Sequence, residues 1–275
     1  MENDAPPVYL LGHSNKELDR LSRQARTYEP LTRRLFHEAG MKAGMRVLDV
    51  GCGSGDVSFL VASIVGETGE VVGADRAAAA VERARAHAKA AEVANVTFLQ
   101  GDPTELKFDR PFDAVVGRLV LMYYPDPADA VRKLAEKVRP GGLIVFQEFD
   151  FDNCRSFPKA PTFDRTVDWT KKTLAATGAS SQMGLELHAV FLAGGLPEPT
   201  MLMEALIGGG SEFARYELIA DTVQVILPMM EKFKIVAPGE VDIANLARQM
   251  QKEVLAGKGV VISPGVIGAW SRKPA

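Results

Sequence analysis

The chain passes from a short apolar run into a loop with glycine at every second position over Val47-Leu48-Asp49-Val50-Gly51-Cys52-Gly53-Ser54-Gly55. Small residues let a backbone turn sharply and let a ligand approach the main chain. The residues that follow, 56–65, have the apolar pattern of a helix, whose first amide groups would face the loop. This stretch therefore predicts a strand, a ligand-binding turn and a helix, in that order.

Strands and helices alternate on both sides of this loop. Short β-branched runs predict strands, and longer amphipathic or alanine-rich segments predict the helices between them. The expected strands are residues 47–50, 70–74, 96–100, 112–117 and 143–148, and the expected helices are residues 56–65, 77–92 and 127–138. This alternation predicts βαβ units, and hence an α/β fold with a doubly wound, mostly parallel sheet.

Beyond this core the pattern is more helical. Residues 14–40 predict a helix with a break at Pro30. Further helices are expected at residues 163–177, 184–193, 211–233 and 241–255, and further strands at residues 200–206, 260–262 and 265–271. We expect three regions in one structural domain. They are a helical lid (1–40), a cofactor-binding core (41–150), and remaining strands with helical cap insertions (151–275).

Composition narrows the class of protein. The chain has 275 residues and a net charge of −3, which disfavours a nucleic-acid partner. We also expect no membrane partner and a cytoplasmic location, because no apolar run is long enough to cross a bilayer. Cys52 and Cys154 form no paired motif and are expected to be free thiols. Four scattered histidines indicate no metal site, and a homodimer is compatible with the sequence.

A glycine loop of this kind can bind either of two classes of nucleotide-like ligand. A dinucleotide fingerprint starting at Gly51 needs a third glycine at position 56, where helix and strand pack closely. The chain has Asp56 there, and its charge would oppose a pyrophosphate. An NAD(P)-dependent oxidoreductase is therefore the weaker alternative. A non-catalytic binder of the cofactor stays open as a second one.

The glycine loop resembles the first motif of the class I S-adenosylmethionine-dependent methyltransferases. Four later segments follow in that family's order, namely Gly73-Ala74-Asp75, Gly101-Asp102, residues 112–121 and residues 138–145. Residues 9–21 also resemble a small-molecule subgroup of the methyltransferase type 11 kind. The resemblance implies a seven-stranded Rossmann-like sheet, S-adenosylmethionine as cofactor, and in-line transfer of a methyl group to a small, partly apolar acceptor.

The resemblance also implies roles for individual residues. Asp75 would accept hydrogen bonds from the ribose hydroxyls and Asp102 from the adenine amino group, although either could instead cap a helix or turn. Arg118 would lie near the methionine end, where it could bind the cofactor carboxylate or form a salt bridge. The residues expected at the cofactor are Asp49, Gly51, Gly53, Gly55, Asp75, Arg76, Gly101, Asp102, Arg118 and, from the lid helix, Gln24.

Methyl transfer from a sulfonium needs alignment and water exclusion more than a protein nucleophile. The sequence contains no nucleophile elbow or triad. Catalytic residues are therefore left unassigned, with His13, Tyr123 and Glu148 as candidates for a general base. Each has an ordinary structural alternative, and neither the acceptor nor the methylated atom follows from the sequence.

Overall fold

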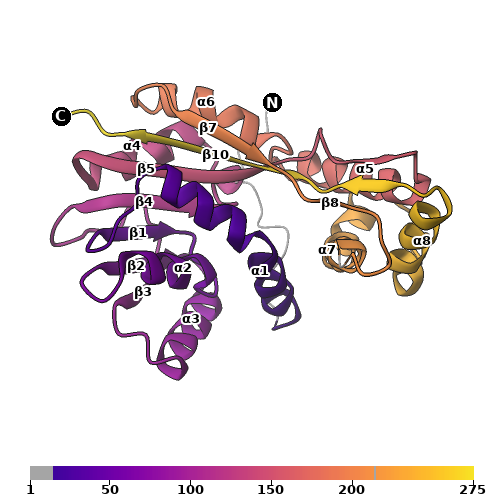
Figure 1. The fold of residues 1–275 in the computed structure, drawn as a ribbon, viewed down its shortest axis with the longest axis horizontal. Helices are drawn as coiled ribbons and strands as arrows, with labels where there is room; N and C mark the ends of the chain where they lie inside the picture. The colour runs from indigo at the N-terminus through magenta and orange to yellow at the C-terminus, as the bar shows by residue number, and fades with distance from the viewer. Residues whose placement is uncertain (1–14, 214) are drawn as a thin grey trace. The chain divides into compact units, whose positions relative to one another are not determined.

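The computed structural model describes residues 15–213 and 215–275 (Figure 1). Its contacts divide the chain into two compact units. Of the described residues, the sheet unit comprises 15–148, Gly184–Leu202 and Ile267–Ala275, and the helical unit comprises Phe149–Met183 and Met203–Val266. The predicted boundaries at residues 40 and 150 stay a prediction, and each unit is described by itself below.

The sheet unit is built on a single seven-stranded sheet of order β3-β2-β1-β4-β5-β10-β7. Its strands are β1 (Arg46–Val50), β2 (Glu70–Asp75), β3 (Val96–Gln100), β4 (Phe112–Arg118), β5 (Val138–Asp150), β7 (Thr200–Glu204) and β10 (Gly265–Arg272). β1 pairs in parallel with β2 and β4, β2 with β3, and β4 with β5. The predicted mostly parallel, seven-stranded sheet is confirmed. The strand order reverses between β1 and β4, where ligands of open α/β sheets bind.

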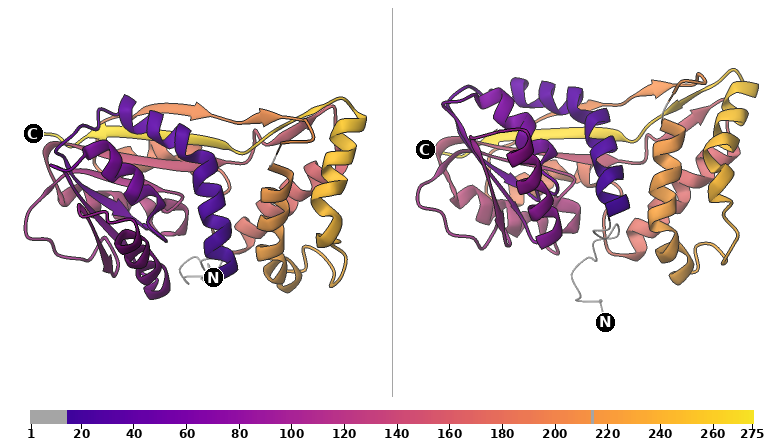
Figure 2. Two further views of the ribbon diagram at one scale, coloured as in Figure 1. Left: turned by 60° about the horizontal axis from the view of Figure 1, so that its bottom comes forward. Right: turned by 90° about the horizontal axis from the view of Figure 1, so that it is seen from below.

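Helices cover both faces of this sheet (Figures 1 and 2). They are α1 (Asn15–Glu38), α2 (Asp56–Val65), α3 (Ala78–Ala90), α4 (Pro127–Glu136) and α6 (Met183–Ala193). Leu35 of α1, Val61 of α2 and Val81 of α3 share one core cluster with strand residues of one face. On the other face the Phe146 ring of β5 meets the Phe191 ring of α6 edge-on, at 6.3 Å between centroids.

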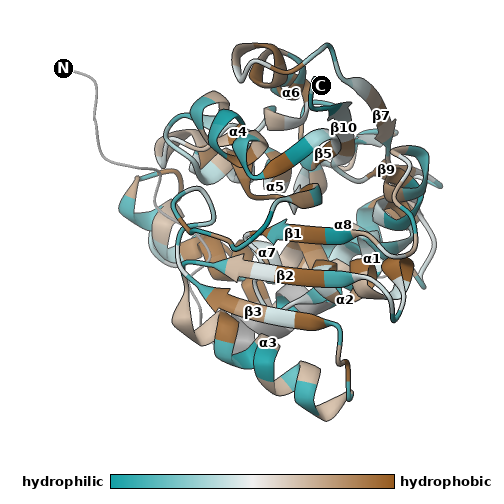
Figure 3. Cartoon of the chain, turned by 90° about the vertical axis from the view of Figure 1, so that its left-hand side faces the viewer, coloured by the Kyte–Doolittle hydropathy of each residue, from teal (hydrophilic) through white to brown (hydrophobic). Residues whose placement is uncertain are grey.

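Hydropathy follows this layering. Figure 3 shows apolar residues along β1, β2 and β3 and many hydrophilic ones on α3, where Ala80, Val81 and Ala84 are the buried side chains. A strand buried on both faces is expected to be apolar throughout, and a helix that covers it needs only one apolar stripe. The five residues of β1 are all buried.

The helical unit has a core of its own. A three-stranded sheet of order β6-β9-β8 packs with three helices, α5, α7 and α8. The bounds are β6 (Arg155–Phe157), β8 (Ile207–Gly208), β9 (Val260–Ile262), α5 (Pro161–Ala176), α7 (Arg215–Lys232) and α8 (Ile243–Ala256). Phe163, Val223 and Met250 lie in its core, and the Thr162 hydroxyl donates to Glu253 at 2.6 Å, joining α5 to α8. No helix of the described residues combines the length and apolarity that crossing a bilayer requires.

Several local expectations are corrected. α1 continues through Pro30, where a break was predicted, because buried residues on both sides, such as Tyr28 and Leu35, hold it in place. β5 begins at Val138, earlier than expected, since Val138 pairs with Phe112. β6 and β8 were not predicted, because strands of three and two residues carry no detectable alternation.

Candidate functional site

The three glycines of the loop after β1 serve different purposes. All have positive φ, which a residue without a Cβ adopts readily. A Cβ on Gly51 would lie 2.5 Å from Val120 Cγ2, and one on Gly55 would lie 2.8 Å from the Phe59 ring. A Cβ on Gly53 would meet nothing within 4 Å. Gly51 and Gly55 are therefore required by packing, whereas Gly53 leaves its backbone open to a ligand.

Asp75 lies directly beside that open position. It ends β2, and its carboxylate accepts from the Gly53 amide at 2.9 Å and from the Ala77 amide at 2.8 Å. The two bonds fix the orientation of the carboxylate and tie the glycine loop to β2. Because each carboxylate oxygen has two lone pairs, both retain capacity for further donors. Asp75 thus bonds to the backbone just before α3 without capping that helix, whose N-cap residue is Ala77, and both of its oxygens can accept further donors.

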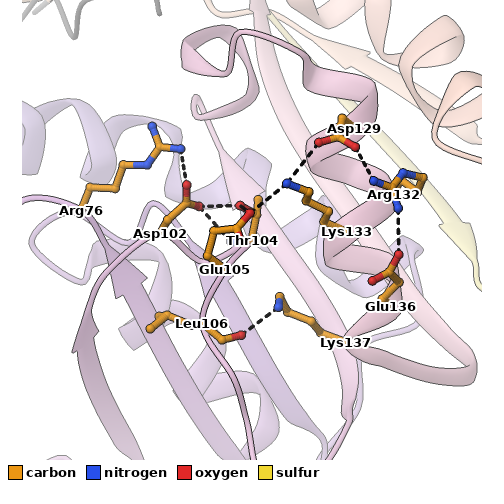
Figure 4. Close-up of polar contacts among 10 residues, drawn as sticks. All are labelled: Arg76, Asp102, Thr104, Glu105, Leu106, Asp129, Arg132, Lys133, Glu136 and Lys137. Atoms are coloured by element: carbon orange, nitrogen blue, oxygen red, sulfur yellow. Dashed lines mark hydrogen bonds and ion pairs between the residues drawn. The ribbon is translucent and has the colours of Figure 1, made fainter.

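Asp102 forms the second acidic position (Figure 4). Its Oδ1 accepts from the Thr104 amide at 2.9 Å and from the Thr104 hydroxyl at 2.8 Å, and its Oδ2 accepts from Arg76 at 2.6 Å. Burial alone would raise the pKa of Asp102, but these bonds lower it. Asp102 is therefore a charged turn residue, and its carboxylate also hydrogen-bonds with the Tyr124 side chain. The preceding Gly101 is required by packing, since its Cβ would meet Leu106 at 2.9 Å.

Arg76 and Tyr124 complete the cluster around Asp102. The Arg76 guanidinium lies 4.9 Å from the centre of the Tyr124 ring, a cation–π distance. Burial, with Asp102 second, raises the pKa of the Tyr124 hydroxyl, so this phenol stays protonated near neutral pH. Arg76 was predicted at the cofactor from the sequence, whereas Thr104 was not. The Asp-Pro-Thr sequence of residues 102–104 is a turn signal that could have indicated Thr104.

Asp49 lies beneath the glycine loop rather than beside the open position. It is fully buried, and the Ser58 hydroxyl of α2 donates to its Oδ2 at 2.6 Å. Burial raises the pKa of Asp49 to about 7 despite that hydrogen bond. The same cause raises the pKa of Asp56 at the start of α2. The Asp49 carboxylate is thus bonded to α2, and its predicted place at the cofactor stays a prediction.

Arg118 brings positive charge to this region. Its positive charge lowers the pKa of both Asp49 and Asp56, although burial raises these values by more. Desolvation lowers the pKa of Arg118 itself. Its guanidinium donates to the Thr32 hydroxyl of α1 at 3.1 Å. Within the described part of the chain, no carboxylate forms an ion pair with it. The predicted salt bridge is absent there, and binding of the cofactor carboxylate stays a prediction.

The candidate bases lie in different surroundings. Glu148 is fully buried in β5, and its Oε1 accepts from the amides of Val120 and Leu121 at 2.9 and 2.8 Å. Burial raises its pKa to about 8. Tyr123 is half-buried in the short 3-10 helix η1 (Leu121–Tyr123). His13 lies outside the described residues, so a general base stays a prediction for all three.

The lid helix contributes one predicted residue that the structure describes. Gln24 Oε1 accepts from Arg20 on the same helix at 2.8 Å. Its role at the cofactor is untested by this contact and stays a prediction. Cys52 and Cys154 are both free and buried. Among residues 15–213 and 215–275, no group of three or more His, Cys, Asp or Glu is arranged to hold a metal ion.

A family model for a methyltransferase domain matches residues 41–191, more than half of the chain. The chain belongs to this methyltransferase family. Membership confirms the predicted class I S-adenosylmethionine-dependent methyltransferase and its cofactor. The match covers the glycine loop, Asp75 and Asp102.

Known relatives of this methyltransferase agree with that assignment. Demethylmenaquinone methyltransferase of Staphylococcus aureus strain MRSA252 is 33% identical over 152 residues, which are 54% of this chain and 60% of that protein. The chain therefore spans about 60% of the length of the curated relatives it matches.

Two solved structures show the same fold. The YcgJ protein of Bacillus subtilis has a TM-score of 0.58 at 21% identity, over 91% of this chain and 99% of its own. Phosphoethanolamine N-methyltransferase 2 of Haemonchus contortus, solved with S-adenosyl-L-methionine, has a TM-score of 0.53 at 18% identity, over 88% of this chain and 52% of its own.

Proposed function

We propose that this methyltransferase moves the methyl group of S-adenosylmethionine to a small, partly apolar acceptor. The Staphylococcus aureus relatives support demethylmenaquinone as the first acceptor to test. The bound cofactor supplies an activated methyl group on a positively charged sulfur. In the reaction, the bond from sulfur to methyl breaks as the bond from methyl to acceptor forms, the sulfur leaves neutral, and the acceptor loses a proton.

The residues around Gly53 fit this cofactor. Asp75 would accept the two ribose hydroxyls through the lone pairs that its bonds to Gly53 and Ala77 leave free. Asp102 Oδ2 would accept the adenine amino group beside Arg76. Arg118 would hold the cofactor carboxylate, because it is partly buried and carries donors beyond its bond to Thr32. Alignment of the cofactor is then the work of residues at the ends of β3, β2 and β4, with the glycine loop after β1 between β2 and β4.

The single observation that carries the proposal is the Asp75 carboxylate, held by two amides next to the open backbone of Gly53. We expect Asp75→Ala to weaken S-adenosylmethionine binding by about 1–3 kcal/mol, the cost of unpaired buried hydroxyls. Isothermal titration measures this loss. Asp126→Ala is the matched control, because Asp126 likewise accepts a backbone amide at a helix start, from Asp129 at 2.9 Å, but lies at α4.

The alternatives give different titration results. Binding of NADH in preference to S-adenosylmethionine would assign an oxidoreductase and refute the proposal. Cofactor binding without methyl transfer to demethylmenaquinone or to a panel of small phenols, amines and thiols would favour the non-catalytic binder. Unchanged affinity in a folded Asp75→Ala protein would contradict the site assignment.

A further inference from the structure

The small sheet of the helical unit turns one set of side chains outward. Its register places Phe157 opposite Val260, Arg155 opposite Ile262, and Ile207 opposite Ile262 from the other side. Side chains alternate between the two faces of a strand, so these five residues share a face. We call it the outer face of the β6-β9-β8 sheet.

The inner face of this sheet is covered. Ser156 is 7% exposed and Val261 is fully buried, and a Cβ on Gly208 would lie 2.3 Å from the Phe213 ring. The outer face is not covered, since Phe157 is 74% exposed and Ile207 is 61% exposed. These are the two highest values among the large hydrophobic residues of the described chain. An apolar patch of this kind marks an interaction site.

The charged side chains on the three strands and in the turns next to them are positive, and the nearest acidic residues in sequence, Asp152, Glu204 and Glu212, lie just outside these segments. Arg155 lies on the face itself, and Lys159 and Lys258 are exposed at its end. A Cβ on Gly259 would lie 2.8 Å from the Phe157 carbonyl oxygen, so the two lysine-bearing turns run side by side. Residues 153–160, 205–211 and 257–264, which make up this sheet and its turns, contain no aspartate or glutamate. In a protein of net charge −3, this local excess of positive charge favours an anionic partner.

The area and the charge of the patch limit the kind of partner. Phe157, Ile207, Val260 and Ile262 together expose about 400 Å² of surface at most, given about 150–250 Å² for a whole aromatic side chain. A stable protein interface takes about 800 Å² from each partner. Because roughly half of a protein interface is apolar, this area alone does not exclude a second copy of this chain. Two copies joined through this face would, however, bring Arg155, Lys159 and Lys258 of both chains together, and like charges oppose such pairing. Shallow insertion into a lipid surface needs only a few apolar side chains with cationic neighbours.

We propose that the outer face docks on the surface of an anionic phospholipid bilayer. Phe157 and Ile207 enter the interfacial layer, and Arg155, Lys159 and Lys258 meet the lipid phosphates. The sequence-based expectation of no membrane partner rested on the lack of a spanning segment, which does not bear on surface docking. The inference stands apart from the methyl acceptor, since it uses no residue of the cofactor site.

Flotation of the full chain with lipid vesicles tests this docking. We expect the protein to float with vesicles of phosphatidylcholine mixed with phosphatidylglycerol, and not with phosphatidylcholine alone. Added salt should release it. Lys159→Gln with Lys258→Gln should weaken binding about 25-fold, about fivefold for each charge. Phe157→Ser with Ile207→Ser should weaken it at least about tenfold.

A matched control removes apolar surface elsewhere. Leu185→Ser with Leu192→Ser changes two leucines of α6 that are 52% and 47% exposed, and binding should stay unchanged. All variants should keep the wild-type melting temperature and affinity for S-adenosylmethionine. Failure of the wild type to float, equal binding to neutral vesicles, or equal losses in the control would overturn the proposal. A dimer in gel filtration that Phe157→Ser with Ile207→Ser abolishes would assign the face to a second copy and overturn it too.

Discussion

Glu148 should make this protein less stable as the pH rises through neutrality. Its side chain is fully buried, and burial raises its pKa from 4.5 to about 8. A carboxyl group whose pKa is raised by folding binds its proton more tightly in the folded state. Between pH 5 and 8 the unfolded chain has lost that proton while the folded chain keeps it, so the free energy of unfolding falls with pH.

The size of the effect follows from the width of that window. Each pH unit inside it changes the free energy of unfolding by at most about 1.4 kcal/mol, so Glu148 accounts for at most about 4 kcal/mol between pH 5 and 8. Glu148→Gln resembles the protonated acid, because its amide oxygen can still accept from Val120 and Leu121. It does not titrate, and its stability should therefore lack this part of the pH dependence.

Urea denaturation of both proteins at each pH from 5 to 8 measures the difference. We expect nearly equal stability at pH 5 and a widening advantage of Glu148→Gln toward pH 8. Asp49 titrates in both proteins and cancels in the comparison. Glu148→Ala is the control for the lost acceptor, because two amides without a partner should cost about 2 kcal/mol or more at every pH. A constant offset between wild type and Glu148→Gln across the range would refute the reasoning.

Two further changes test the charges around the glycine loop. Ser58→Ala removes the hydroxyl that donates to Asp49. The free energy of unfolding should fall by about 1 kcal/mol at pH 5 and by more at pH 8, where Asp49 is charged. A loss in urea denaturation that does not change with pH would contradict this. Arg76→Ala breaks a pair whose side chains are 53% and 27% exposed, so it should cost less than about 1 kcal/mol and raise the pKa of Asp102. Denaturation in low and high salt measures the stability loss, and carboxyl NMR measures the pKa of Asp102. An unchanged Asp102 pKa would count against the ion pair.

The sequence predicts best what local patterns determine. The strands at residues 47–50 and 96–100 were expected where β1 and β3 lie, because apolar runs between turns depend little on distant contacts. Asp75 and Asp102 could be named, but their partners could not. Gly53 and Asp75 are far apart in the sequence, and Arg76 reaches Asp102 only because β2 and β3 are adjacent. The buried position of Asp49 also follows only from tertiary packing.

The glycine loop illustrates why a motif alone does not separate packing from binding, and two substitutions can separate them. Gly53→Ala has open space but φ of +53°, so we expect a stability loss of about 1–2 kcal/mol. Gly55→Ala adds contacts of 2.8 and 2.9 Å with the Phe59 and Phe98 rings to φ of +91°, and should cost about 3 kcal/mol or more. For affinity toward S-adenosylmethionine, the two variants should rank in the opposite order. A methyl group on Gly53 projects into the open space on the loop, where we expect the cofactor, and should weaken binding at least about tenfold, a loss of about 1.4 kcal/mol. Folded Gly55→Ala should bind nearly as the wild type does. Thermal denaturation ranks the two stabilities and isothermal titration ranks the two affinities. Equal affinity of the two variants would show that Gly53 serves the backbone conformation of the loop and not the cofactor.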